Sequence, residues 1–196
     1  MIRTNLLLVV LAISEANTFE NPFTATEKIE LIKNHNVVRA LPGALYMECI
    51  LGWNDHLQEY AQNLANKCDP GRPSNSRHGI AYYRNNRTTI DANTFTRALY
   101  HAFGAYYNYS AGSCINDDED CKNGFQMVWQ QGGYIGCGRA NCKSTQLAVC
   151  AYTHKAVYQM KPFLAAPMNN GTPYPPCSVC TSEMSTCVDD LCCRAQ

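Results

Sequence analysis

The sequence has no hydrophobic run long enough to cross a membrane, since a transmembrane helix needs roughly 20 consecutive apolar residues. The apolar run at the N-terminus, residues 6–13, is far shorter, and no later segment is apolar enough. This run follows Arg3 and precedes the small residues Ser14 and Ala16, which is the pattern of a secretory signal peptide. An N-terminal anchor or a buried strand are the alternatives, and the length of the run disfavours both. We therefore expect residues 1–16 to be removed and the protein to be secreted and extracellular.

The sequence also lacks a net charge. Its 16 Lys and Arg residues balance 16 Asp and Glu residues, and no run of Lys or Arg forms a basic stripe. Without such a field nothing gathers phosphates, so we expect no nucleic-acid partner. The roughly 180 residues that follow the signal peptide fit one domain with a core of its own.

Cysteine, by contrast, is abundant, with twelve residues. An even number behind an export signal indicates disulfide bonds, so we expect all twelve to be paired. Cys177 and Cys180 have the spacing of a zinc ribbon, but zinc needs a second pair of thiolates, and exported thiols are normally oxidised. A cysteine protease would need a free thiol beside a histidine. We therefore expect neither a zinc site nor a catalytic cysteine.

Three Asn-x-Ser/Thr sequences, at Asn86, Asn108 and Asn170, are acceptors for N-linked glycans. A glycan cannot be buried, so each acceptor that is used must lie on the surface. These sequences fit the secreted glycoprotein that the N-terminus indicates.

Local patterns predict three helices. Thr24 and Glu27 form a capping box for a helix that ends near residue 40, before Pro42. Apolar residues repeat at three and four over residues 53–68, which predicts a second helix. Asp91 or Asn93 caps a third, whose apolar face runs from Phe95 to Tyr106. The polar stretch over residues 72–87, between the second and third helices, is typical of a loop.

Later segments favour strands, because they are short, apolar and rich in β-forming residues, over residues 134–138, 146–152 and 156–160. Helices come first and strands last, without alternation, so the expected fold class is α+β, an antiparallel sheet covered by helices. Residues 164–196 form a Pro/Gly-rich linker and a cysteine-rich tail.

Six segments, in order, resemble the successive motifs of the CAP superfamily (SCP/TAPS), the group of the venom-allergen-like proteins. They are His35-Asn36-x-x-Arg39, Met47 before Trp53-Asn54, Ala61-Gln62-x-x-Ala65-x-x-Cys68, Gln126-Met127-Val128-Trp129, Ile135-Gly136-Cys137-Gly138 and Val149-Cys150-Ala151-Tyr152. The cysteine spacing from Cys177 to Cys193 resembles the short tail of the parasitic-worm members, of the schistosome type. The resemblance implies a CAP domain over residues 17–163 with an α-β-α sandwich fold.

The resemblance also implies disulfide pairings and packing roles. Cys68 is expected to pair with Cys142, and Cys137 with Cys150. Cys114 and Cys121 enclose an acidic loop and are expected to pair with each other. The loop could suggest calcium, but it lacks the glycine and terminal glutamate of an EF-hand, so a solvated loop is favoured. His35, Asn36 and Arg39 repeat a family packing motif, for which we expect hydrogen bonds between helix and sheet.

Family members with a metal site use two histidines and two glutamates in a cleft, a suitable ligand set for a divalent cation. In this sequence His78 is assigned to the first histidine position, whereas Ile80, Ala102 and Asn123 stand at the other three. A single imidazole without a carboxylate neither binds zinc tightly nor acts as an oriented base. The resemblance therefore implies no metal, no cofactor and no catalytic residue, so we expect that the protein is not an enzyme.

CAP relatives bind sterols through an aromatic-rich loop after the third helix, and fatty acids in a slot between helices. Tyr106, Tyr107 and Tyr109 are the corresponding candidates for lipid binding in this sequence. Phe103 and Tyr106 are expected to belong to the helix core, and Tyr107 and Tyr109 to border an entrance.

The function that follows is a secreted, non-catalytic binding protein for a sterol or fatty acid. The alternative is a secreted immunomodulatory, allergen-like effector that binds an extracellular host protein. A channel-blocking toxin is a third possibility, but the tail is too short for the full cysteine-rich domain of venom members.

Overall fold

The structure is a computed structural model that describes residues 19–20, 22–69, 71–86, 89–166, 168–169 and 172–195. The expected signal peptide and the acceptor Asn170 lie outside the described residues. No helix within the described ranges is long and apolar enough to cross a membrane. The helices are α1 (Ala25–Ala40), α2 (Asp55–Asn66), α3 (Ala92–Tyr106), the short 3-10 helix η1 (Ile115–Asp117) and α4 (Glu119–Met127).

The capping residues place the helices where the sequence predicts them. The Thr24 side chain accepts from the Glu27 amide, and Glu27 accepts from the Thr24 amide, so the capping box is present. Asp91 rather than Asn93 caps α3, accepting from the Thr94 amide at 2.7 Å. α2 begins after Asn54 and ends before Cys68, whose φ of 56° is incompatible with helix.

The acidic segment before Lys122 is not only a solvated loop, because it also starts α4. Asp118 caps this helix by accepting from the Cys121 amide at 2.7 Å, and Glu119 and Asp120 lie in its first turn. Carboxylates are favoured there because the N-terminus of a helix carries partial positive charge. The negative charges that favour a solvated loop thus stabilise a helix start.

The main sheet is built around β6 (Gly133–Cys142), in the order β1-β6-β7-β3, and β2 also pairs with β6. The other members are β1 (Phe19–Glu20), β2 (Ile50–Trp53), β3 (Gly79–Asn85) and β7 (Thr145–Tyr152). All pairs are antiparallel except the parallel pair of β2 with β6. Two-stranded pairs lie outside this sheet, namely β4 (Tyr107–Asn108) with β5 (Ser113–Cys114), and β8 (Met168–Asn169) with β9 (Thr172–Pro173).

Two predictions about strands were wrong. The polar stretch over residues 72–87 contains β3, which pairs with β7 along its whole length, from Gly79 opposite Tyr152 to Asn85 opposite Gln146. Residues 156–160 form no strand, because they run past the end of the sheet. The Ala156 amide donates to the Gln126 side chain at 2.8 Å and not to a neighbouring strand. A turn follows, in which the Met160 amide donates to the Val157 carbonyl.

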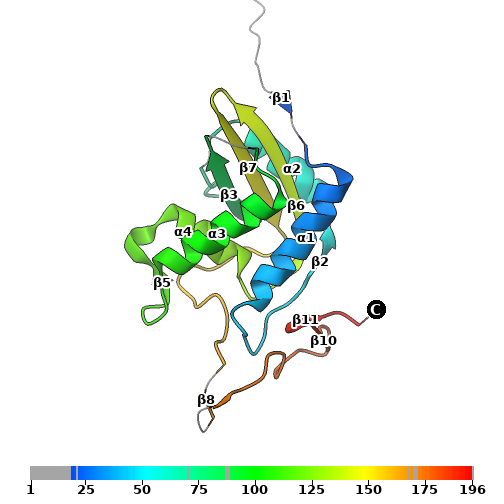
Figure 1. The fold of residues 1–196 in the computed structure, drawn as a ribbon, viewed down its shortest axis with the longest axis vertical. Helices are drawn as coiled ribbons and strands as arrows, with labels where there is room; N and C mark the ends of the chain where they lie inside the picture. The colour runs from blue at the N-terminus through cyan, green and yellow to red at the C-terminus, as the bar shows by residue number, and fades with distance from the viewer. Residues whose placement is uncertain are drawn as a thin grey trace, which may run out of the picture.

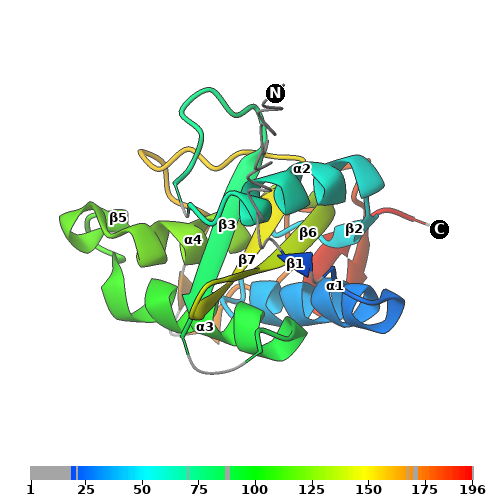
Figure 2. The ribbon, with the colours of Figure 1, turned by 90° about the horizontal axis from the view of Figure 1, so that it is seen from above.

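Helices cover both faces of the sheet, as an α-β-α sandwich requires (Figures 1 and 2). α2 packs on one face through Leu57, Ala61, Leu64 and Ala65, while α1, α3 and α4 share the core on the other face. α2 approaches β6 at glycines: a Cβ on Gly136 would lie 2.1 Å from the Gln58 nitrogen. Only glycine allows this close contact between helix and strand backbones.

The expected polar packing of α1 is confirmed. His35 contacts the Tyr152 hydroxyl on β7 at 2.9 Å, and the Asn36 amide exchanges two hydrogen bonds with Ile50 on β2. Arg39, only 1% exposed, donates to four backbone carbonyls, those of Glu48, Met127, Trp129 and Gln130. These bonds fix α1 against the sheet and against the loop after α4.

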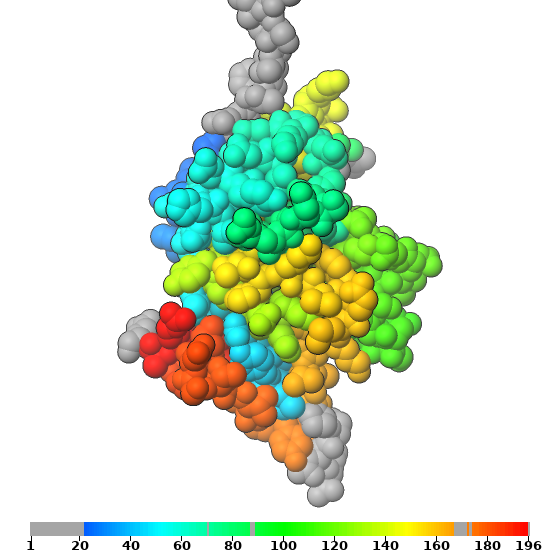
Figure 3. Space-filling model, turned by 180° about the vertical axis from the view of Figure 1, so that it is seen from behind, coloured from blue at the N-terminus to red at the C-terminus, as the bar shows by residue number. Residues whose placement is uncertain are grey.

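The cysteine-rich tail folds into a hairpin, β10 (Thr186–Val188) with β11 (Leu191–Cys193), and docks at one end of the molecule (Figure 3). Its turn places Asp189 and Asp190 at positive φ, which Asp tolerates better than most residues. The Cys192 amide donates to the Met47 carbonyl at 2.8 Å, and Leu191 is 1% exposed. The tail therefore packs on the domain and buries part of its own surface there.

Candidate functional site

A cleft of about 540 Å³ opens beside the start of β3. Figure 3 shows the two segments that meet there, the loop before β3 and the chain after β7. The lining combines two cations, one imidazole, hydroxyls and apolar side chains: Arg72, Pro73, Ser74, Ser76, His78, Ile80, Lys155, Ala156, Val157, Tyr158 and Gln159.

Arg72 is the central polar group of this cleft. Its Nε donates to the Ile80 carbonyl at 3.1 Å, one Nη pairs with Glu119, and the other donates to the Asn123 side chain. The guanidinium lies 5.4 Å from the ring centre of Tyr82 and 5.6 Å from that of Tyr158. These contacts hold a fixed positive charge between two aromatic rings.

His78 and Arg72 both come from the loop before β3, but they make different contacts. His78 lines the cleft, but its ring packs edge-on against Tyr60 on α2, at 5.4 Å, and Arg72 is the side chain that contacts Asn123. Of these two side chains from the loop before β3, it is Arg72 that lies against Asn123, one of the residues expected at the four ligand positions. Burial lowers the pKa of His78, and the charge of nearby Arg77 lowers it further.

The other three positions contain no metal ligand. The Asn123 side chain is fully buried, and its oxygen accepts from Arg72 and from the Tyr82 amide at 3.0 Å. Ile80 turns its side chain into the core beneath α2, and Ala102 lies on α3. Imidazole and carboxylate groups suit a divalent cation, and these positions contain neither. The guanidinium of Arg72 lies beside Asn123 and would repel a cation. The residues of this cleft do not fit a metal ion.

The tyrosines after α3 occupy different environments from those predicted. Phe103 is buried as expected, but Tyr107 is buried too, at 7% exposed, with its ring stacked on Phe103 at 4.6 Å. Tyr106 and Tyr109 are 48% and 59% exposed. The prediction that Tyr106 is core was therefore wrong, and so was the prediction that Tyr107 borders an entrance. Tyr107 lies four residues after Phe103, on the same helix face, and its pairing with Cys114 in β4–β5 directs the ring inward.

A second hollow, of about 310 Å³, runs between α1 and α3. Val37 and Leu41 on α1 are 55% and 57% exposed, and both line it. The remaining lining is Asn34, Val38, Asn93, Thr96, Arg97, Tyr100 and His101. We call this hollow the α1–α3 slot; it combines an apolar wall with one exposed cation, Arg97.

A third hollow, of about 740 Å³, lies between the tail hairpin and β2. Its walls include Ile50 and Leu51 on one side and Val188, Asp189 and Arg194 on the other. We call it the tail groove. Val188 and Tyr134, which also line it, are 47% and 40% exposed.

Residues 32–152 match the family model of the Cysteine-rich secretory protein family, CAP. The chain belongs to this family. It is 30% identical over 127 residues to "Repressed by EFG1 protein 1" of Candida albicans, a match over 63% of this chain and 44% of that protein. It is 28% identical over 134 residues to venom allergen 5 of Vespa mandarinia, over 59% of this chain and 66% of that protein. The chain thus matches only part of the length of these relatives.

A solved structure shows the same CAP fold. The venom allergen-like protein 4 of Schistosoma mansoni superposes with a TM-score of 0.58, at 22% identity, over 74% of this chain and 97% of that one. The likeness agrees with the resemblance to venom-allergen-like proteins of worms, and it concerns the fold alone.

All twelve cysteines of this CAP protein are disulfide-bonded. The expected pairs Cys68–Cys142, Cys137–Cys150 and Cys114–Cys121 are all present. The pairs that sequence left open are Cys49–Cys193, Cys177–Cys187 and Cys180–Cys192. The first of them joins the tail to the domain covalently.

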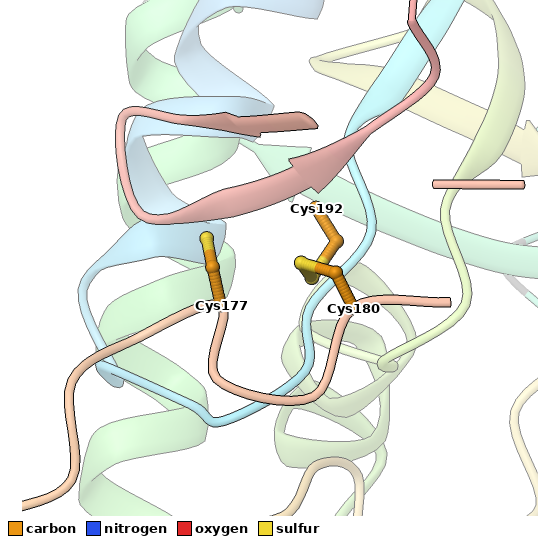
Figure 4. A group of neighbouring side chains, drawn as sticks. All are labelled: Cys177, Cys180 and Cys192. Carbon is orange, nitrogen blue, oxygen red and sulfur yellow. A yellow bond between two sulfur atoms is a disulfide. The ribbon is translucent and has the colours of Figure 1, made fainter. Parts of the chain in front are cut away.

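Three sulfur atoms in the tail gather closely enough to suggest a metal site. Those of Cys177, Cys180 and Cys192 lie within 4.8 Å of one another beneath the tail hairpin (Figure 4). Each belongs to a disulfide, and a disulfide sulfur is not the thiolate that zinc binds. The group therefore serves to hold the hairpin together.

Of the predicted glycosylation sites, Asn86 and Asn108 are exposed, as a glycan requires. The Asn108 side-chain oxygen accepts from the amides of Ser110 and Ala111, at 3.0 Å each. The side-chain nitrogen of Asn108 is the atom to which a glycan would be attached.

Proposed function

We propose that this CAP protein is a secreted, non-catalytic carrier that binds a fatty acid in the α1–α3 slot. The observation that supports the proposal is the pair Val37 and Leu41, large apolar side chains left more than half exposed along a hollow that also contains Arg97. An apolar hollow with a few placed polar groups is the usual form of a small-molecule site, and about 310 Å³ is at the lower end of the usual size.

The arrangement matches the two parts of a fatty acid. The acyl chain would lie along Val37, Val38 and Leu41, where it removes apolar surface from water. The carboxylate would lie near Arg97, which can offer two parallel N–H groups to it. Arg97 is exposed, so its contribution is at most about 1 kcal/mol.

The affinity follows from these terms. Complete enclosure of a chain of about 16 carbons gains roughly 12 kcal/mol, at about 0.8 kcal/mol per CH2. Small-molecule sites commonly bury roughly 70–90% of the ligand surface, so we take about three quarters of that gain, or roughly 9 kcal/mol. Association costs at least about 4 kcal/mol, and the ion pair returns about 1 kcal/mol. The remaining 6 kcal/mol or so corresponds to a dissociation constant of tens of micromolar.

A sterol is less well supported than a fatty acid. The aromatic loop that should take a sterol is closed, because Tyr107 packs between Phe103 and Phe125, 4.6 and 5.8 Å away. The lack of catalysis is proposed from the cleft, where a guanidinium stands among residues that are not metal ligands.

The test is direct binding of labelled palmitate and labelled cholesterol to the secreted protein. We expect palmitate to bind, and Val37→Asp with Leu41→Asp to weaken it at least tenfold. Ile29→Asp is the matched control, since Ile29 is an equally apolar residue of α1, 69% exposed, that does not line the slot. If palmitate does not bind below about 1 mM, the carrier function is refuted. The protein-binding effector is then the function to test, with the tail groove as its first candidate surface.

A further inference from the structure

The described side chains that line the cleft beside β3 include positive charges but no negative ones. Arg72 and Lys155 line it, and none of the other described residues that line it is a carboxylate. Glu119 pairs with Arg72 from behind, but it is shared with Lys122, whose ammonium group lies 3.0 Å from its other oxygen. The cleft thus presents positive charge to anything that enters.

The guanidinium of Arg72 is rigidly positioned. It is bonded to the Ile80 carbonyl, Glu119 and Asn123. A cation held in this way loses little freedom on binding an anion, and a planar guanidinium presents several N–H groups to one carboxylate. Lys155 also lines the cleft, from the chain after β7, and its ammonium group donates to the Ser76 carbonyl at 3.0 Å.

A buried polar atom in the same cleft lacks a partner. The Nδ1 atom of His78 is inaccessible to solvent and has no hydrogen bond within the described part of the chain. Buried polar groups are normally paired, so this nitrogen is an exception among the described residues, as is the side-chain nitrogen of Asn123. The rest of the wall is largely apolar, with Pro73, Ala156, Val157 and Tyr158.

We propose that this cleft binds a small organic anion, with its carboxylate between Arg72 and Lys155 and an apolar body against Val157 and Tyr158. Arg72 supplies, as a permanent part of the chain, the positive charge that a metal ion would otherwise bring to this place. The ligand is therefore bound without a metal, and it differs from the fatty acid of the α1–α3 slot in size and in site. The proposal does not depend on that slot.

Benzoate is a suitable probe, and benzamide is its neutral control of nearly the same shape. Both are titrated into isotope-labelled protein, and amide and Arg side-chain NMR shifts are followed with and without a chelator. We expect benzoate to bind with a millimolar dissociation constant, at least tenfold more tightly than benzamide, and to shift Arg72, His78 and Tyr158. A chelator should change nothing.

Two variants and a control locate the site. Arg72→Gln should weaken benzoate at least fivefold, and Lys155→Gln two- to fivefold. Lys155 is exposed, so its variant tests the proposal even if Arg72→Gln fails to fold. Lys33→Gln removes an exposed cation of α1 that lines none of the hollows described above, and it should have no effect. Equal binding of benzoate and benzamide, shifts that cluster elsewhere, or binding that needs added zinc would each overturn the proposal.

Discussion

Acidification should destabilise this protein in part through His35. Its side chain is 0% exposed, with Nδ1 2.7 Å from the Leu31 carbonyl and Nε2 2.9 Å from the Tyr152 hydroxyl. A carbonyl oxygen can only accept, so Nδ1 carries the hydrogen and Nε2 accepts from Tyr152. Protonation would place a second N–H at Nε2, where the hydroxyl now donates. It would also bury a charge near Arg39.

The magnitude follows from the pKa. Burial lowers the pKa of His35 from about 6.5 to about 4, and the charge of Arg39 contributes in the same direction. The unfolded chain therefore binds this proton more readily than the folded protein. The stability associated with neutral His35 is complete above about pH 6.5 and is lost as the pH falls through 4. A difference of about 2.5 pKa units corresponds to roughly 3 kcal/mol.

The assay compares urea unfolding of the natural protein and His35→Gln between pH 7 and pH 4, with the disulfides intact. Glutamine retains a donor and an acceptor but does not titrate, and the other ionisable groups are common to both proteins. We expect the natural protein to lose roughly 3 kcal/mol more than the variant over this range. A difference below about 1 kcal/mol would refute the reasoning, as would an NMR titration midpoint of His35 near 6.5.

Three further perturbations test other parts of the structure. Arg39→Met should lower the free energy of unfolding in urea by about 3–5 kcal/mol, because four backbone carbonyls lose a charged donor and two of these bonds are buried; a loss below 1 kcal/mol would contradict this. Replacing Cys68 and Cys142 together by serine should cost about 4 kcal/mol in the same assay, since the bond closes a loop of 74 residues. In glycosylating cells, Asn108→Gln should lower the protein mass by one glycan, and an unchanged mass would show that this acceptor is not used.

Features encoded within a few residues could be predicted from the sequence, and features that depend on distant pairing could not. The capping box of Thr24 and Glu27 is complete within one helical turn, so α1 was predicted at its correct start. β3 has few local strand signals, and its backbone is satisfied by β7, more than sixty residues further along the chain. No window of sequence around Gly79 contains that partner.

In the tyrosine cluster, a difference of one position along the chain reverses which side chain is buried and which is exposed. Phe103 is core, and both the third and the fourth residue after it can share its face. The third, Tyr106, was assigned to the core, but the fourth, Tyr107, is the one that α3 and β4 bury. Which of the two tyrosines is buried depends on where α3 ends. That end is fixed by the pairing of Tyr107 with Cys114 and by the disulfide between Cys114 and Cys121.

The cleft beside β3 depends even more on long-range contacts. Both Arg72 and His78 lie in the loop before β3, and sequence spacing cannot decide which of them reaches the cleft interior. Asn123, 51 residues after Arg72, determines the position of the Arg72 side chain. Its buried oxygen needs hydrogen-bond donors, and the guanidinium provides one. Once Arg72 is in place, a metal ion would have to displace a cation that is bonded on three sides. Asn123→His would therefore not by itself create a metal site, since it would also remove the side-chain oxygen that accepts from Arg72. The side chains at these positions and the guanidinium of Arg72 both disfavour a metal ion, so we expect this cleft to bind its ligands without one.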